Sequence, residues 1–207
     1  MLKFFFGPHS CALASHIALE EAGADYEAVR LDLVAGDHKK PEFLKLNPKA
    51  RVPALVTDRG VLTENPAILA YVAQTAPKAK LAPLDDAYAF GKIQSFNAYL
   101  CATAHVAHAH GRRGYRWADE QSSYDDMKRK VPETMVVIFE LIEKEMFEGP
   151  WVAGTDYSIA DPYLFTLASW MESDKVDPQR FPALLDHRQR MEQRPAVQRV
   201  LPLHARA

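Results

Sequence analysis

Cys11 is one of only two cysteines in the chain, and it stands where an expected strand gives way to an expected helix. Phe4–Phe6 form an apolar run typical of a buried strand, and Gly7 and Pro8 end that run. Apolar residues then recur at helical spacing up to Gly23, a natural C-terminal stop. A helix N-terminus favours an anion, so this position is expected to lower the pKa of the thiol. A buried and inert cysteine is the alternative, and position alone does not separate the two.

A second set of reactive side chains lies in the stretch FNAYLCATAHVAHAHGRRG. Asn97, Cys101, His105 and His108 have the spacing i, i+4, i+8, i+11, which predicts one polar stripe on a helix. Apolar residues on the neighbouring face should turn to the core, so the polar stripe should border a cleft. An imidazole there could accept a proton near neutral pH. No acidic or cysteine partner completes a metal set with these histidines, and a core histidine bonded to backbone remains the alternative for His108.

The whole chain sets broad limits on function. Its 207 residues suffice for one large or two small domains, and a formal net charge of −2 argues against a nucleic-acid binder. We find no apolar stretch of membrane-spanning length, and the apolar run of MLKFFFGPHS is too short for a signal peptide. Two cysteines ninety residues apart form no disulfide framework, so we expect a reducing cytoplasm.

The secondary structure expected around these residues falls into two groups. The first eighty residues predict a small α/β unit, in which a tight turn at Asp58–Gly60 joins antiparallel strands and therefore implies a mixed sheet. The expected strands are Phe4–Phe6, Tyr26–Leu33, Val52–Val56 and Val61–Leu62, and the expected helices begin at Ala12, at Pro41 (ending at Leu46) and at Thr63 or Glu64.

A linker is expected at Pro77–Pro83, and the residues after it predict only helices. Ser158 followed by Asp161 resembles a capping box at the start of a helix that is apolar nearly all round. The expected helices are Asp85–His110, Ser122–Phe147, Ser158–Met171 and Phe181–Gln193.

Four segments in this order resemble the cytosolic glutathione transferases, most closely the bacterial beta class: SCALASHIALEEAG, NPKARVPAL, LTENPAILAYVA and SIADPYLFTLASWM. The resemblance covers essentially the full length. It implies a thioredoxin-like α/β N-terminal domain at residues 1–77 that binds glutathione. It also implies an all-helical C-terminal domain at residues 84–207 with the electrophile site, and a homodimer.

The resemblance also assigns glutathione contacts. Pro53 would be a cis proline, and Val52 would offer its N–H and C=O to the cysteinyl part of glutathione. Glu64 would meet the γ-glutamyl ammonium and Asn65 the γ-glutamyl carboxylate, although the family usually has serine in place of Asn65. From the residues alone, Pro53 could simply end an edge strand and Glu64 could be a first-turn acid.

The cation for the glycyl carboxylate is less clearly marked. A beta-class lysine would fall near Gly36, so His38 or Lys39 is expected to supply the charge. Arg51 replaces a usual glutamine and is expected either to contact the peptide or to be a solvated surface charge.

The choice of the residue that activates the glutathione thiol depends partly on which residues the sequence lacks. The N-terminal tyrosine of many relatives is absent, and the beta-class pattern favours Cys11 over the neighbouring Ser10. His105 matches an active-site histidine of that class. The expected function is conjugation of glutathione, without metal, to hydrophobic electrophiles, with thiol exchange or peroxide reduction through Cys11 as side activities. The alternative is a non-catalytic glutathione-transferase-like binding or regulatory protein. Neither nucleic acid nor membrane is an expected partner.

Overall fold

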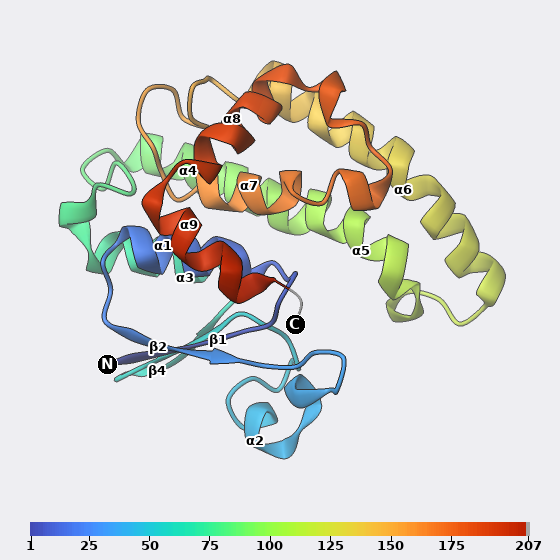
Figure 1. Cartoon of the computed structure of the whole chain (residues 1–207), viewed down its shortest axis with the longest axis horizontal. Coiled ribbons are helices and arrows are strands. Elements are labelled where there is room, and N and C mark those ends of the chain that lie inside the picture. The colour runs from blue at the N-terminus through green and yellow to red at the C-terminus, as the bar shows by residue number, and fades with distance from the viewer. Residues whose placement is uncertain (206–207) are drawn as a thin grey trace.

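A four-stranded mixed sheet forms the base of the molecule in the computed structural model, which describes residues 1–205 (Figure 1). The strand order is β2-β1-β3-β4, with β1 parallel to β2 and antiparallel to β3, and β3 antiparallel to β4. The mixed sheet expected from the tight turn is therefore confirmed. The strands are β1 Leu2–Phe6, β2 Tyr26–Arg30, β3 Ala54–Thr57 and β4 Gly60–Thr63.

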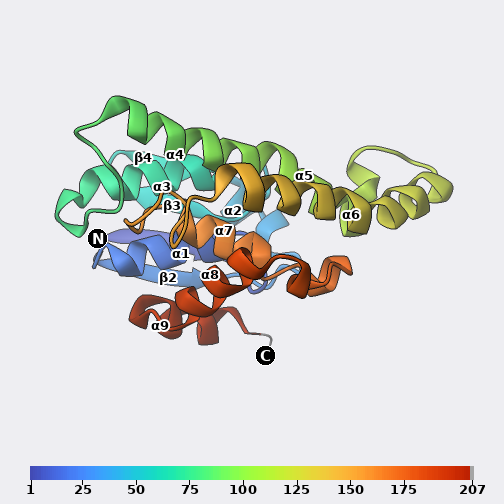
Figure 2. The same ribbon diagram turned by 90° about the horizontal axis from the view of Figure 1, so that it is seen from above.

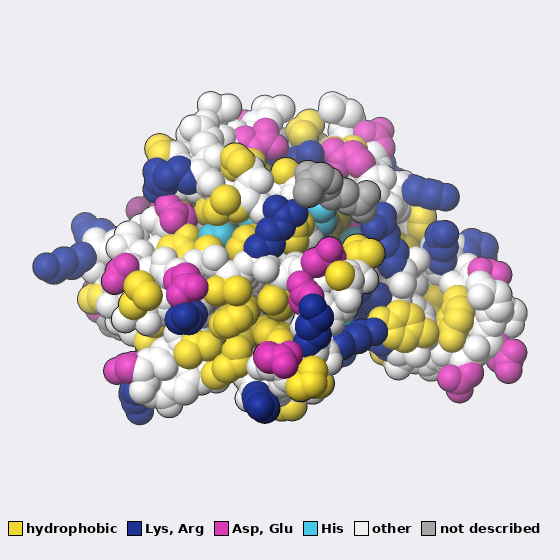
Figure 3. All heavy atoms as spheres, turned by 60° about the horizontal axis from the view of Figure 1, so that its bottom comes forward, with side chains coloured by type: hydrophobic (Ala, Val, Ile, Leu, Met, Phe, Trp, Pro, Cys, Tyr) yellow, Lys and Arg dark blue, Asp and Glu magenta, His cyan; other side chains and the backbone are white. Residues whose placement is uncertain are grey.

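Helices pack on both faces of this sheet, although one face is only partly covered (Figures 1 and 3). Phe4 of β1 is buried and packs against His16 of α1, whereas Phe5 points to the opposite face and packs against Phe43 of α2. This alternation is what a strand dictates, because successive side chains leave on opposite faces. Seen from below, a patch of hydrophobic side chains lies on the side of the sheet away from α1 and α3 (Figure 3). The helices of this unit are α1 Ala12–Glu21, η1 Asp37–Lys39, α2 Pro41–Leu44 and α3 Asn65–Thr75.

The rest of the described chain is helical, and its long pair of helices extends beyond the sheet (Figures 1 and 2). Two of the expected long helices contain a π-helical segment, which the sequence pattern did not predict. The elements are η2 Pro77–Ala79, α4 Ala87–Tyr99, η3 (π) Leu100–Ala104, α5 His105–Arg113, η4 Gly114–Arg116, α6 Gln121–Leu141, η5 (π) Ile142–Met146, α7 Asp161–Ala168, η6 Glu172–Asp174, η7 Pro178–Arg180, α8 Pro182–Glu192 and α9 Pro195–His204. Within residues 1–205, no helix is both long and apolar enough to cross a bilayer.

Asp161 fixes the buried helix α7 to its surroundings. Its carboxylate accepts hydrogen bonds from the N–H of Ser158 at 2.7 Å and of Val152 at 2.8 Å, and lies 3.0 Å from Nε2 of His187. One half of the expected capping box is thus present. The other half differs, because the Ser158 hydroxyl accepts from the N–H of Ala160 instead.

Helix α9 was not expected from the sequence, and it contains Pro202, a residue that ordinarily interrupts a helix. It returns to the sheet unit and lies along α1 (Figure 1). Nε2 of His204 lies 2.9 Å from Nδ1 of His16. Arg194 forms a bidentate ion pair with the carboxylate of Glu21. The end of the helical unit is therefore fastened to the first helix of the chain.

Candidate functional site

A cavity of about 400 Å³ separates the sheet unit from α5, and the residues singled out from the sequence meet there. The junction of β1 and α1, the loop before β3, the start of α3 and the exposed end of α5 all contribute to its wall. The expected site residues that line it are Ser10, Cys11, His38, Lys39, Arg51, Val52, Pro53, Glu64, Asn65 and His105. The structure thus brings every one of them to one cavity.

Cys11 is the residue before the first turn of α1, as expected, but its thiol does not behave as the sequence suggested. Its Sγ lies 3.6 Å from the carbonyl oxygen of Val52 and donates a hydrogen bond to it. Burial raises the pKa of the Cys11 thiol to about 12, and the nearby Arg113 guanidinium only partly offsets this. The expectation of a lowered pKa at the helix terminus is therefore wrong, because loss of solvation outweighs the nearby positive charge.

The neighbouring hydroxyl of Ser10 is occupied by the backbone. It donates to the carbonyl oxygen of Gly7 at 2.6 Å and accepts from the N–H of Ala12 at 3.3 Å. Ser10 therefore shapes the junction that carries Cys11, and its hydroxyl is less available to a ligand than the Cys11 thiol.

The Val52–Pro53 peptide bond is cis, and β3 begins directly after it. Asn47 is buried and donates from Nδ2 to the carbonyl oxygen of Arg51 at 2.7 Å, which holds this loop in place. Within residues 1–205, the Val52 N–H has no hydrogen-bond partner. A peptide-like ligand could pair with this backbone as a strand does.

Glu64 and Asn65 mark the start of α3, and each has a partner that the sequence did not predict. Glu64 has a φ of 72°, an uncommon conformation for a residue with a side chain, and forms an ion pair with Lys49. The Asn65 side chain donates to the carbonyl oxygen of Cys11 at 2.8 Å and accepts from the Ser15 hydroxyl at 2.5 Å. Asn65 therefore holds the Cys11 backbone, so a carboxylate at this helix start would meet the Asn65 N–H more readily than the side chain.

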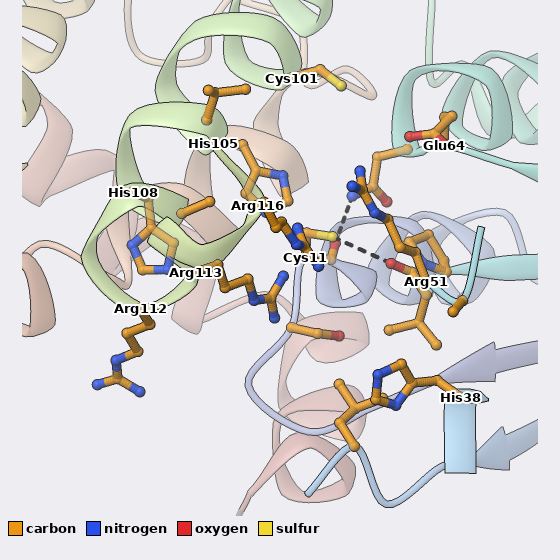
Figure 4. A pocket seen from close by; sticks show the side chains of 18 of the residues that line it. Cys11, His38, Arg51, Glu64, Cys101, His105, His108, Arg112, Arg113 and Arg116 are labelled. Atoms are coloured by element: carbon orange, nitrogen blue, oxygen red, sulfur yellow. Dashed lines mark hydrogen bonds between the residues drawn. The ribbon is translucent and has the colours of Figure 1, made fainter. Parts of the chain in front are cut away.

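His38 and Lys39 enter the cavity from the short helix η1 (Figure 4 labels His38). Burial and then the charge of Lys39 lower the pKa of His38. Its Nδ1 is buried and has no hydrogen-bond partner among the described residues. Both side chains can therefore offer a donor to a ligand.

The predicted stripe on the α4–α5 helix holds for three of its four members. Cys101, His105 and His108 line the cavity, but Asn97 is fully buried outside it. The π-helical segment between α4 and α5 changes the number of residues per turn, so spacing that assumes one continuous α-helix misplaces Asn97. Burial lowers the pKa of His105 to about 4, and His108 and Arg113 add to this effect. The imidazole of His105 is thus neutral at pH 7.

One interpretation of the sequence makes His108 a core histidine bonded to backbone. The structure gives His108 a carboxylate as its partner instead. Its Nδ1 lies 2.8 Å from both carboxylate oxygens of Asp174, and its ring stacks on Trp170 with centroids 4.2 Å apart. Trp170 also packs against His105, with centroids 5.4 Å apart. Asp174 and Trp170 thereby fix both histidines at the wall of the cavity.

The sequence analysis missed a group of arginines at the end of α5. Arg112, Arg113 and Arg116 line the cavity together with Arg51. Arg113 and Arg116 extend toward Cys11, whereas Arg112 points away from it (Figure 4). These arginines are visible in the sequence as GRRGYRW. Basic residues in the last turn of a helix ordinarily interact with the helix dipole, so they do not by themselves indicate a binding site. Within residues 1–205, we find no cluster of three or more residues suited to hold a metal ion.

Comparisons with known proteins agree with this arrangement. Residues 1–74 match the family described as glutathione S-transferase, N-terminal domain, and residues 101–195 match the corresponding C-terminal domain. The chain is 31% identical to the glutathione S-transferase GstA of Escherichia coli O157:H7, over 97% of each chain.

Two solved structures are similar over 98% of both chains. A glutathione transferase homologue from Sulfitobacter, solved with bound glutathione, is 44% identical with a TM-score of 0.95. A beta-class glutathione S-transferase from Sphingomonas chungbukensis is 34% identical with a TM-score of 0.86.

Proposed function

The chain belongs to the glutathione S-transferase family of enzymes, and on that premise we propose that its cavity binds glutathione and transfers it to an electrophile. The observation that carries the proposal is that Cys11, Val52, Glu64 and His105 line one cavity. A binding protein without catalysis would not need a half-buried thiol and a neutral imidazole beside the free N–H of Val52.

Glutathione fits the cavity as an extended peptide. Its cysteinyl part pairs with the free N–H and the carbonyl oxygen of Val52. Its γ-glutamyl ammonium meets Glu64, and its γ-glutamyl carboxylate meets the N-terminus of α3. His38 and Lys39 lie on the same wall and offer donors to the glycyl carboxylate.

Cys11 acts in this scheme as a hydrogen-bond donor. Because its own pKa is raised, it keeps its proton and can donate S–H to the sulfur of bound glutathione, as it now donates to Val52. The surrounding guanidinium groups favour the anionic form of that sulfur, so its proton leaves to water. The glutathione thiolate then forms a bond to the electrophilic carbon, and the leaving group departs with its electron pair.

Thiol exchange through Cys11 is the second candidate activity, and Cys11 beside the bound sulfur is the observation in its favour. It requires Cys11 as a thiolate, which the raised pKa disfavours, so this exchange should be slow. We also propose a homodimer in a reducing cytoplasm, on the strength of the family and of two free cysteines.

A thermal-shift titration with glutathione tests the proposed function. Wild-type protein should be stabilised by millimolar glutathione, and Glu64→Gln should need more ligand for the same shift. The control is Glu133→Gln, at an exposed acid on α6 that also pairs with a lysine. Absence of any shift in the wild-type protein would favour the non-catalytic alternative.

A further inference from the structure

The arginines of the cavity differ from most arginines elsewhere in the described chain. Arg113 and Arg116 form no ion pair within residues 1–205, and neither do Arg51 and Arg112. The arginines that do pair with a carboxylate are Arg129, Arg180, Arg188, Arg190, Arg194 and Arg199. Positive charge is thus gathered at the cavity without a matching acid.

The acids near the cavity pair with other residues and do not neutralise these arginines. Glu64 is the acidic residue in its wall, and it is paired with Lys49. Asp174 lies behind the wall and is paired with His108. Burial and the charges of Arg113 and Arg51 lower the pKa of Arg116, so the guanidinium groups are close enough to repel one another. A cluster of this kind is poised to bind an anion, because guanidinium pairs with carboxylate through two parallel hydrogen bonds.

The carboxylates of glutathione do not need Arg113 or Arg116 as partners. Its carboxylates are matched, in the proposed pose, at the start of α3 and at His38 and Lys39, all on the sheet unit. Arg113 and Arg116 come from the end of α5 and from η4, which face Cys11 from the helical unit (Figure 4). They therefore point to the space beside the glutathione sulfur, where an acceptor must lie for the sulfur to reach it.

The same segment supplies aromatic surface. Tyr115 and Trp117 flank Arg116 in sequence and line the cavity with it. The Trp117 ring packs edge-on against His110, with centroids 4.4 Å apart. Two guanidinium groups beside aromatic rings suit a planar molecule that carries a negative charge.

We propose that the second substrate is an electrophile with a carboxylate, which Arg113 and Arg116 bind beside Trp117. This inference rests on the proposed glutathione-dependent function and adds a carboxylate to the hydrophobic electrophile expected from the sequence. With an aryl chloride, the glutathione sulfur bonds to the ring carbon, chloride leaves with the bonding electrons, and the thiol proton passes to water.

A matched pair of acceptors tests the proposal: para-chloro-meta-nitrobenzoate and the corresponding benzamide. Each kcat/KM is divided by the uncatalysed rate with glutathione, which corrects for the difference in intrinsic reactivity. The wild-type enzyme should favour the carboxylate by about tenfold or more, and the Arg113→Gln/Arg116→Gln variant should lose that preference. Arg59→Gln is the control, because Arg59 is an exposed arginine at the β3–β4 turn, outside the cavity wall.

A binding measurement makes the test independent of turnover. Quenching of tryptophan fluorescence reports the affinity of meta-nitrobenzoate and of meta-nitrobenzamide, because Trp117 and Trp170 line the cavity. The carboxylate should bind about tenfold more tightly, with or without glutathione, and the double arginine variant should lose this difference.

Other results of these two experiments would refute either the carboxylate site or the proposed function. Equal affinity for the two compounds in the wild-type protein, or a preference that survives in the double variant, refutes the carboxylate site. A double variant that loses glutathione affinity while its preference is unchanged shows that the arginines serve glutathione, which also refutes it. A carboxylate preference without glutathione binding contradicts the proposed function and leaves the anion site standing.

Discussion

The Cys11 thiol donates a hydrogen bond to the carbonyl oxygen of Val52, and this contact joins the helix start to the loop before β3. Only the protonated thiol can make it. The contact and the raised pKa agree that Cys11 rests as a thiol, so its role with glutathione differs from that of an attacking thiolate.

Alkylation with iodoacetamide should therefore show no low-pKa thiolate at Cys11. Its rate should rise about tenfold for each pH unit from pH 7 to 10 without reaching a plateau, because the ionised fraction keeps increasing below the pKa. Peptide mass mapping distinguishes Cys11 from Cys101 in the same sample. A plateau for Cys11 below pH 8 would show a thiolate and restore the expectation drawn from the sequence.

Oxidised glutathione should form a mixed disulfide on Cys11 only slowly at pH 7, through attack of the small thiolate fraction on the disulfide sulfur. Cys11→Ala should abolish the adduct while glutathione still binds through Val52 and Glu64. An adduct on Cys11 that completes as fast as with a free low-pKa thiol would favour thiol exchange as the main activity.

Asp161→Ala should destabilise the protein strongly, because it leaves buried N–H groups and His187 without their acceptor. The expected loss is about 3–5 kcal/mol in the free energy of unfolding, measured with urea. Asp186→Ala, at an exposed site on α8, is the control and should cost less than about 1 kcal/mol. A folded Asp161→Ala protein with unchanged stability but lost turnover would contradict the structural role.

Stability should fall in mild acid because of the His16–His204 contact between α1 and α9. Burial lowers the pKa of His16 to about 4, although the charge of Glu20 acts to raise it. Burial also lowers the pKa of His204 to about 3, and the charges of His16 and His9 lower it further. Both pKa values lie below the ordinary value of 6.5. Between about pH 4 and pH 6.5, the unfolded chain therefore binds more protons than the folded protein does. The free energy of unfolding should therefore fall as pH decreases from 6.5 toward 4.

His204→Phe should flatten this pH dependence, since phenylalanine keeps a ring against Phe6 and cannot be protonated. His110→Phe on α5 is the control and should keep the wild-type slope. Equilibrium unfolding in urea at several pH values measures both. An unchanged slope in His204→Phe would show that other groups govern acid sensitivity.

Light scattering at micromolar concentration should return twice the mass of the 23.3 kDa chain, as proposed for a homodimer. The helix pair α5–α6 extends beyond the sheet of its own chain (Figure 2), and a second subunit would cover more of it. Monomer mass alone would remove the proposal.

The sequence predicted the mixed sheet because strand alternation and tight turns are local signals. The common site of Cys11, Val52, Glu64 and His105 was implied instead by the resemblance of short motifs to a known family. The sequence did not predict α9, which contains Pro202 and which tertiary packing on α1 supports. It misjudged the Cys11 pKa and the arginines for a shared reason: burial and unpaired charge depend on segments distant in sequence, which no spacing pattern records.

Activation of glutathione by this cavity can be measured through the ultraviolet absorption of the glutathione thiolate, followed by difference spectroscopy during a pH titration of the complex. The Cys101→Ala variant is used so that Cys101 does not contribute to the absorption. The Cys11 thiol, with its raised pKa, should remain protonated and not absorb as a thiolate below pH 10. We expect the pKa of bound glutathione to lie well below the value of about 8.5 for a free thiol. A bound thiol that ionises at or above that value would contradict the claim that this cavity activates glutathione.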